Sequence, residues 1–239
     1  MPALDGRVIV VTGAAKRIGR AIALRAAREG AHVAAHFHGS EKEAHATATE
    51  CGAAQVFQAD LEKVAEIERL FENVQRHFGR IDGLVNSAGR FASIDPLKIT
   101  EADWDFIHSV NLKATFFCAQ QGARRMLEGE GGRIVNLSSL GGLRPWAQHA
   151  HYSASKAGVI MLTRALAKAW APKIAVNSVA PGVIPMGEPS DEAVDLIRRT
   201  PAGRAGDADE VADAVLYFLT ASKFITGQVL AVDGGLSQR

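Results

Sequence analysis

The sequence has little of several features that mark other classes of protein. It contains two cysteines, Cys51 and Cys118, which lie in segments of helical character without a CxxC pair or a Cys/His cluster. Neither a disulfide framework nor a metal site is indicated, and reduced thiols predict a cytoplasmic protein. No apolar run is long enough to cross a membrane, and the first run, "VIVV", is too short for the core of a signal peptide.

An excess of charge of one sign is also missing. The chain has 27 Lys and Arg residues against 26 Asp and Glu residues, a formal net charge of +1. No overall field therefore favours nucleic acid, an anionic membrane or an acidic partner. Any basic site must be local.

What the sequence does have is a regular alternation of short apolar runs with segments of helical period. Seven runs rich in Val and Ile, bounded by Gly, Asn, Asp or Pro, predict strands buried on both faces. They cover residues 7–12, 31–37, 54–59, 81–86, 132–138, 173–180 and 227–233. We expect one α/β domain over residues 1–239, with a seven-stranded parallel sheet flanked by helices on both faces.

One segment interrupts this alternation. Residues 181–192, "PGVIPMGEPSDE", contain three prolines and two glycines, which exclude a continuous helix or strand. A loop that follows a parallel strand lies at the ligand-binding edge of the sheet. We therefore expect residues at about 183–203 to form a lid over a substrate.

The stretch "VIVVTGAAKRIG", residues 8–19, reads as a strand, a turn and the start of a helix. Gly13 permits the turn, Gly19 allows close packing of helix on sheet, and the helix N-terminus offers backbone N–H groups to a pyrophosphate. The motif alone leaves open an ordinary strand-to-helix turn without a ligand.

The end of the second predicted strand favours NADP over NAD. Folds that bind NAD place an acidic residue there for the ribose 2′-OH, whereas this chain has His36, Phe37 and His38. Donors suited to a 2′-phosphate lie nearby in Lys16, Arg17 and Ser40. The alternative is that the two cations are solvated surface residues.

"HYSASKAGV", residues 151–159, places Tyr152 and Lys156 four residues apart, on one face of a predicted helix. A free tyrosine is a poor acid at pH 7, and a nearby ammonium lowers its pKa by stabilising the phenolate. Tyr152 is then able to protonate a carbonyl oxygen while hydride reaches the carbon. Ser138 and Ser139, at the end of a predicted strand, are placed to orient that oxygen.

Together these motifs resemble those of the short-chain dehydrogenase/reductase family over essentially the whole chain. The matching stretches are "TGAAKRIG", "NSAG" (86–89), "NLSS", "YSASK", "PG" (181 and 182) and "ITGQVLAVDGG" (225–235). The resemblance implies a Rossmann-type doubly wound domain and a homotetramer that pairs through the last strand and the helix of "SASKAGVIMLTRALAKAW". It also implies the catalytic set Asn111, Ser139, Tyr152 and Lys156, with Asn111 holding a water that links the lysine to a proton relay.

The resemblance further implies how the chain binds NADP(H). Asp60 matches the adenine contact and Ile184 the backbone contact to the nicotinamide carboxamide. The predicted cofactor residues are Gly13, Lys16, Arg17, Ile18, Gly19, His36, Phe37, His38, Ser40, Asp60, Leu61, Asn86, Ala88, Gly89, Tyr152, Lys156, Pro181, Gly182 and Ile184. Two positions depart from the family pattern: Arg17 replaces the middle glycine of the turn, and Met186 stands where a threonine usually contacts the cofactor.

The predicted substrate-binding residues are Phe91, Ser139 and Trp146. For the two aromatic residues, packing inside the protein is the alternative. His149 and His151 flank the catalytic segment, and we expect no catalytic role for them, because the tyrosine and the lysine already supply the proton path.

The expected activity is NADPH-dependent reduction of a ketone, with pro-S hydride transfer as the family implies. "HFHGSE" resembles 3-oxoacyl-carrier-protein reductases, which favours a 3-oxoacyl thioester or similar small-molecule substrate. Pteridine reductases are a close alternative, because "TGAAKRIG", "HFHGS" and the position of Phe91 resemble them, although they tend to have aspartate at the position of Ser139. A redox sensor that binds dinucleotide without turnover is an alternative from another class, and its mark, a broken Tyr/Lys pair, is absent from the sequence.

Overall fold

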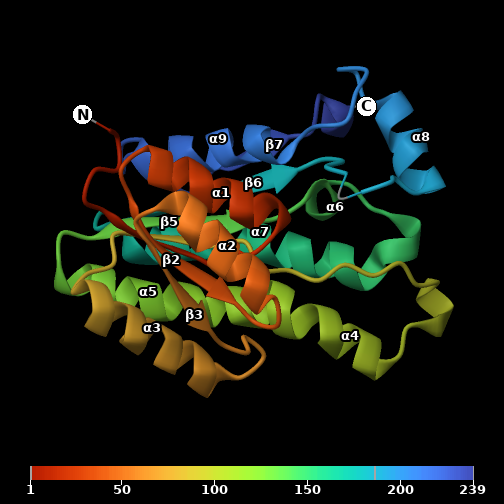
Figure 1. Ribbon diagram of the computed structural model, residues 1–239. Coiled ribbons are helices and arrows are strands. Elements are labelled where there is room, and N and C mark those ends of the chain that lie inside the picture. Colours follow the sequence, from red (N-terminus) through yellow and green to blue (C-terminus); the bar gives the residue numbers. More distant parts are fainter. Residues whose placement is uncertain (1, 186, 239) are drawn as a thin grey trace.

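The computed structural model describes residues 2–185 and 187–238, so the predicted departure at Met186 lies outside the described residues. One parallel sheet runs through the molecule in the order β3-β2-β1-β4-β5-β6-β7 (Figure 1). The strands are β1 (Val8–Val11), β2 (His32–Phe37), β3 (Ala54–Gln58), β4 (Gly83–Asn86), β5 (Gly132–Leu137), β6 (Ile174–Pro181) and β7 (Val229–Val232). All seven predicted strands and the parallel sheet are confirmed.

Helices connect the strands and cover both faces of the sheet (Figure 1). They are α1 (Arg17–Arg28), α2 (Glu41–Cys51), α3 (Val64–Phe78), α4 (Glu101–His108), α5 (Thr115–Glu128), α6 (Leu140–Leu143), α7 (Ala150–Trp170), α8 (Asp191–Arg199) and α9 (Ala208–Thr220). The chain builds the sheet outward from β1 to β3 and then crosses to β4 on the other side of β1. Such a reversal of strand order is where doubly wound folds bind their ligands.

Alternate residues of each central strand enter two separate cores. In β1, Ile9 packs against α1 and α9 on one face, whereas Val10 packs against α3, α5 and α7 on the other. A strand covered on both faces must be apolar at successive positions, which explains the continuous apolar runs. The prediction of complete burial is wrong for the edge strands β3 and β7, whose residues are half-buried or exposed, because an edge has a neighbouring strand on one side only.

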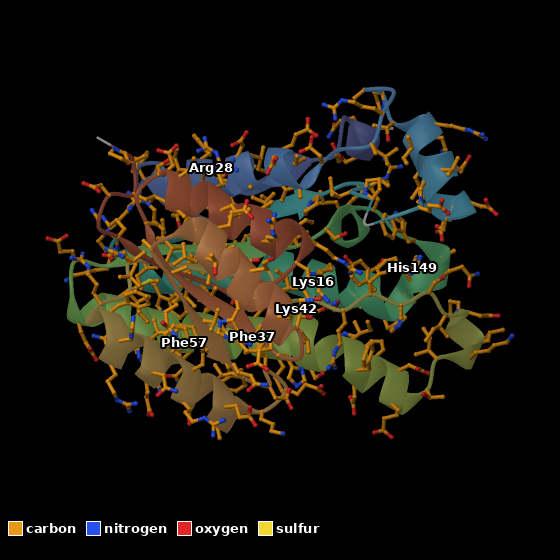
Figure 2. The ribbon with its side chains drawn as sticks, viewed as in Figure 1. Lys16, Arg28, Phe37, Lys42, Phe57 and His149 are labelled. Carbon is orange, nitrogen blue, oxygen red and sulfur yellow. The ribbon has the colours of Figure 1, made fainter. Side chains whose placement is uncertain are left out.

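The carboxyl ends of the parallel strands meet at one edge of the sheet. Lys16, which precedes α1, lies on the side of the molecule that carries His149, and Arg28 lies at the far end of the same helix (Figure 2). The segment after β6 forms no regular element between residues 182 and 185 or between 187 and 190, as the prolines and glycines predict. The helix α8 follows and has no fully buried residue. Its function as a lid stays a prediction.

Among the described residues, no helix has both the length and the apolar character needed to cross a membrane.

Candidate active site

The turn between β1 and α1 is closed by two glycines. Gly13 has a φ of 68°, in the left-handed region that glycine adopts without strain. A Cβ on Gly19 would lie 2.1 Å from the carbonyl oxygen of Gly13, so a side chain there would force the helix away from the turn. The helix starts after Lys16 with neither a side-chain cap nor an acidic residue in its first turn. Its N-terminal N–H groups are therefore left for an anion, which fits a dinucleotide pyrophosphate.

Arg17, the first residue of α1, has a φ of 57°. A non-glycine residue in this region costs about 1–2 kcal/mol, which explains why glycine is usual at this position of the motif. Arg17 is exposed, and Lys16 beside it forms an ion pair of 2.9 Å with Glu43 of α2. The two cations thus differ, because Lys16 already has a carboxylate partner.

The predicted phosphate contacts at the end of β2 divide into buried and exposed residues. His36 is buried; its Nδ1 accepts from the Gly13 N–H over 3.1 Å, and its Nε2 lies 3.0 Å from the Ala59 carbonyl oxygen. Because a carbonyl only accepts, Nε2 carries the proton, and burial lowers the pKa of His36 to about 4. Phe37 is also buried. The exposed groups here are His38 and, in part, Ser40, which precedes α2.

Hydrogen bonds from β4 tie this turn to the next strand. The Thr12 hydroxyl oxygen accepts from the backbone N–H groups of Ser87 and Ala88, over 3.0 and 3.1 Å. A Cβ on Gly13 would lie 3.0 Å from the Ala88 Cα, so the two segments touch. Thr12 was not among the predicted site residues, although a threonine directly before the first glycine was the available signal. Asn86 is turned inward, and its amide donates to the Asn136 side chain over 2.9 Å.

Lys156 lies buried beneath the loop that follows β4. Its Nζ donates to the Leu137 carbonyl oxygen over 2.8 Å, and burial lowers its pKa to about 8. A Cβ on Gly89 would lie 3.6 Å from this Nζ and 3.4 Å from Asn111 Oδ1. Gly89 thus packs directly against the lysine and the asparagine, both of which are buried, and a ribose that hydrogen-bonds the lysine stays a prediction.

Tyr152 lies close to Lys156, whose Nζ is 5.9 Å from the centre of the phenol ring. Burial raises the pKa of Tyr152, and a hydrogen bond with the Ser139 hydroxyl opposes that shift. Burial and Ser139 account for this shift, and a lowering of the Tyr152 pKa by the Lys156 charge stays a prediction. Ser139 also caps α6 by accepting from the Gly141 N–H over 3.1 Å.

Asn111 lies in a π-helical segment, Ser109–Ala114, between α4 and α5. Its Oδ1 accepts from the Arg90 N–H over 2.7 Å, and its Nδ2 donates to the Arg90 carbonyl over 2.9 Å and to the Ser155 hydroxyl over 3.2 Å. The side chain thus fixes the loop after β4 against α7, and a water held by Asn111 stays a prediction. π-Helical turns occur frequently at functional sites, yet neither this turn nor the contact residues Arg90 and Ser155 were predicted.

The predicted substrate residues meet beside Tyr152. Phe91 is 58% exposed, which excludes the alternative of core packing for it. Its ring lies 4.8 Å from that of Tyr152 and 6.3 Å from that of Trp146, perpendicular to both, and it stacks on His149 at 4.6 Å. Trp146 is half-buried. Nε2 of His149 lies 3.5 Å from a carboxylate oxygen of Glu192. Glu192 belongs to α8, so this contact joins α8 to the site.

Comparisons with known proteins agree with this geometry. A family model described as enoyl-(acyl carrier protein) reductase matches residues 13–237. The chain is 40% identical to the (2S)-[(R)-hydroxy(phenyl)methyl]succinyl-CoA dehydrogenase subunit BbsD of Thauera aromatica, covering 98% of both chains. It is 38% identical to a 3-oxoacyl-[acyl-carrier-protein] reductase of Thermotoga maritima, again over 98% of both. The chain belongs to the short-chain dehydrogenase/reductase family.

Solved structures of short-chain dehydrogenase/reductases show the same fold. A variant of the Serratia marcescens enzyme superposes with a TM-score of 0.94 at 32% identity, covering 99% of this chain and 100% of that one. A dehydrogenase/reductase of Sinorhizobium meliloti has a TM-score of 0.93 at 35% identity, covering 98% and 96%. Membership of the family makes this chain an oxidoreductase that acts on CH–OH or C=O groups and uses a nicotinamide dinucleotide.

The remaining predicted cofactor residues of this short-chain dehydrogenase/reductase lie after strand ends, except for Ile18 in the first turn of α1. Asp60 follows β3, where its carboxylate accepts from the Glu62 N–H over 3.1 Å and pairs with Lys63, and Leu61 beside it is buried. Gly182 follows Pro181 at the end of β6, and a Cβ there would lie 2.7 Å from the Asp233 Cα. Ile18 and Ile184 pack partly into the core on the α1 side. Over the described ranges, no group of three metal-ligating side chains comes together.

Proposed function

We propose that this short-chain dehydrogenase/reductase transfers hydride from NADPH to the carbonyl carbon of a ketone, of which a 3-oxoacyl thioester is the leading example. The observation that carries the proposal is the grouping of the Ser139 and Tyr152 hydroxyls above a buried Lys156. Two relatives support the choice of substrate, because both are named for acyl groups carried as thioesters, on acyl carrier protein and on coenzyme A. One of these names also includes a phenyl group next to the hydroxyl-bearing carbon.

In the proposed reaction each side chain has one task. The reduced nicotinamide supplies the hydride when NADPH is bound. Ser139 donates a hydrogen bond to the carbonyl oxygen and orients it, and Tyr152 gives that oxygen its phenolic proton. Burial raises the pKa of Tyr152, so the phenol holds its proton at neutral pH and depends on a neighbouring positive charge to become a better acid. The Lys156 ammonium then stabilises the phenolate that remains.

The choice of NADPH rests on the missing carboxylate at the end of β2 and on Arg17. The neutral His36 and the buried Phe37 present no charge that would repel a 2′-phosphate. Arg17 offers an exposed guanidinium beside the uncapped start of α1, and such a group forms strong charge-assisted hydrogen bonds with phosphate. His38, Ser40 and Lys16 complete the proposed set.

Replacing Tyr152 by phenylalanine tests the chemistry. We expect Tyr152→Phe to lower kcat for ketone reduction by about 10²- to 10⁴-fold, the usual contribution of a positioned acid, with the dissociation constant of NADPH little changed. Tyr217→Phe is the matched control, because Tyr217 is the other tyrosine of the chain and lies on α9. A variant at Tyr152 that keeps most of its turnover would remove the proton-donor assignment.

Reduction of a dihydropterin is a second candidate function. The exposed Phe91 beside Tyr152 favours it, because a flat heterocycle would cover that ring. Ser139 speaks against it, since pteridine reductases tend to carry aspartate there. A redox sensor without turnover is supported less well, because Ser139, Tyr152 and Lys156 are all present. Turnover assays with NADPH against acetoacetyl thioesters and dihydropterins distinguish the three.

We also propose that the protein is a homotetramer that pairs through β7 and α7. Side chains exposed near these elements include Leu230 of β7, Met161 of α7 and Tyr217 of α9. Apolar side chains on an edge strand are otherwise an aggregation risk, and four identical chains usually close with dihedral symmetry. Light scattering that shows a monomer at micromolar concentration would overturn this proposal.

A further inference from the structure

Aromatic rings from three separate segments gather beside the Tyr152 hydroxyl. Phe91 comes from the loop after β4, Trp146 from the segment between α6 and α7, and Tyr152 from α7 itself. The Trp146 and Tyr152 rings are nearly parallel, at 16° and 6.4 Å between centres. The Phe91 ring stands at 85° to Tyr152 and at 89° to Trp146. The site thus presents ring surfaces in two perpendicular orientations.

The rings are held in place although Phe91 is 58% exposed. Phe91 stacks on His149 with 29° between the planes, and the ring nitrogen of the buried His149 lies 2.9 Å from the Ala92 carbonyl oxygen. A backbone hydrogen bond of 2.8 Å from Ile94 to Gln148 joins the two loops. Phe91 is therefore a fixed surface, and binding a ligand there costs little ordering of the protein.

The backbone at Gly141 lies next to both the catalytic serine and these rings, because its N–H donates to the Ser139 hydroxyl oxygen over 3.1 Å. A Cβ on Gly141 would lie 3.2 Å from Tyr152 Cε1 and 3.5 Å from Trp146 Cε3, so Gly141 borders both rings. A carbonyl oxygen bound to Tyr152 and Ser139 must place its carbon within a few ångströms of this point. One substituent of that carbon therefore lies against Trp146 and Phe91.

We propose that this substituent is a flat aromatic ring, so that the substrate class is a carbonyl or C=N group attached to, or part of, a planar π-system. The inference rests on the proposed reductase function and narrows its substrate. Aromatic rings attract one another in offset-stacked and edge-to-face arrangements with centres 4.5–7 Å apart. Perpendicular walls offer one incoming ring both arrangements at once, whereas a saturated chain gains only contact area.

The test compares two ketones of nearly equal size and hydrophobicity on the full-length protein with saturating NADPH. One is the benzoylacetyl thioester of N-acetylcysteamine, and the other is its cyclohexyl analogue, in which the phenyl ring is saturated. Conjugation changes the intrinsic reactivity of a ketone, so the informative quantity is the change in the phenyl-to-cyclohexyl ratio of kcat/KM on mutation. We expect Phe91→Leu and Trp146→Leu each to lower that ratio about three- to tenfold. Phe224→Leu, at a ring that is 96% exposed on the loop before β7, is the matched control and leaves the ratio unchanged.

Each outcome has one meaning. A ratio that stays within about twofold of the wild type in both variants overturns the aromatic-ring inference and leaves the reductase function intact. Turnover of dihydropterin that falls in the same two variants supports the inference and assigns the ring to the heterocycle instead of an aryl ketone. Bound NADPH without turnover of thioester or pterin overturns the proposed function itself, and the substrate inference with it.

Discussion

The backbone N–H of Gly13 donates to Nδ1 of His36 over 3.1 Å, which joins the cofactor turn to the end of the second strand. The other ring nitrogen reaches the Ala59 carbonyl oxygen at the end of β3. One neutral imidazole thus connects three strand ends at the nucleotide side of the sheet. A protonated ring would lose the acceptor that Gly13 requires.

This arrangement predicts that the free energy of unfolding decreases as the pH is lowered, because His36 is protonated more easily in the unfolded chain. Burial lowers its pKa to about 4 from an ordinary value of 6.5, so the folded protein keeps the ring neutral while the unfolded chain protonates it. The contribution of His36 is complete above pH 6.5 and is lost progressively as the pH falls towards 4, reaching about 2 kcal/mol of lost stability by pH 5. Urea unfolding at pH 7.5 and at pH 5, at one protein concentration, measures this loss.

The control for that measurement is a non-titrating residue at the same position. Asparagine keeps an oxygen acceptor for Gly13, so His36→Asn should be less stable than wild type at pH 7.5 yet lose less stability on acidification. His38→Asn, at the exposed neighbour, should keep the wild-type pH dependence. Equal losses in wild type and His36→Asn would show that other groups govern the acid response.

Lys156 predicts an alkaline limit to activity. Burial lowers its pKa to about 8, so the ammonium that stabilises the Tyr152 phenolate is present below that pH and is lost above it. We expect kcat/KM for NADPH, which reports the free enzyme, to fall above about pH 8 with a slope of one proton. Lys223→Met is the control and should leave this alkaline decrease in kcat/KM unchanged. Burial also lowers the pKa of Lys223, but its ammonium donates to the Glu130 carbonyl far from the site. A constant kcat/KM up to about pH 9.5 would contradict the prediction.

The fold was predictable because its strands are short runs of β-branched and small apolar residues bounded by turn formers. What the apolar pattern did not reveal is which strands lie at the edges: "AQVFQA" and "GQVLAVD" resemble the central runs, and only pairing across the sheet leaves β3 and β7 with one neighbour each. The π-helical turn at Asn111 was not predictable either, because its apolar spacing does not differ from that of an α-helix.

The site residues that belong to a sequence motif were predictable. Which of their neighbours reach a ligand was much less so, because that depends on the direction of each side chain. His36 and Phe37 stood in the right stretch, but alternation along a strand sends their side chains to opposite faces, and both are buried. His38 would share the side of His36 if the strand continued, but it lies beyond the end of β2 and is exposed. The Thr12 contact to Ser87 and Ala88 joins segments more than seventy residues apart, so the threonine before Gly13 did not reveal its partners.

Replacing Arg17 by glycine should weaken the binding of NADPH and at the same time relieve backbone strain. Arg17→Gly and Arg17→Ala both remove the guanidinium, so both should weaken NADPH binding by about 1.5–3 kcal/mol and leave NADH nearly unchanged. With a φ of 57°, the glycine variant should be more stable than the alanine variant by about 1 kcal/mol. Titration of both cofactors and thermal unfolding measure the two effects. If the ratio of the NADPH and NADH dissociation constants is unchanged and the KM for the substrate rises instead, Arg17 binds the substrate.

The ion pair between Lys16 and Glu43 leads us to expect that the Glu43 carboxylate lowers the affinity for NADPH. Glu43 holds the lysine at 2.9 Å and would repel a 2′-phosphate that competes for it. Glu43→Gln should therefore lower the dissociation constant of NADPH by about two- to fivefold, with no effect on NADH and with a smaller gain at high salt. Glu41→Gln is the matched control, because Glu41 lies in the same turn of α2 and its carboxylate lies 4.0 Å from the His45 ring instead of contacting Lys16. Both substitutions remove one negative charge from the same helix start, so a general field effect would improve NADPH binding equally in the two variants. Only a direct contact with Lys16 confines the gain to Glu43→Gln, and isothermal titration of NADPH and NADH against the two variants decides between these cases.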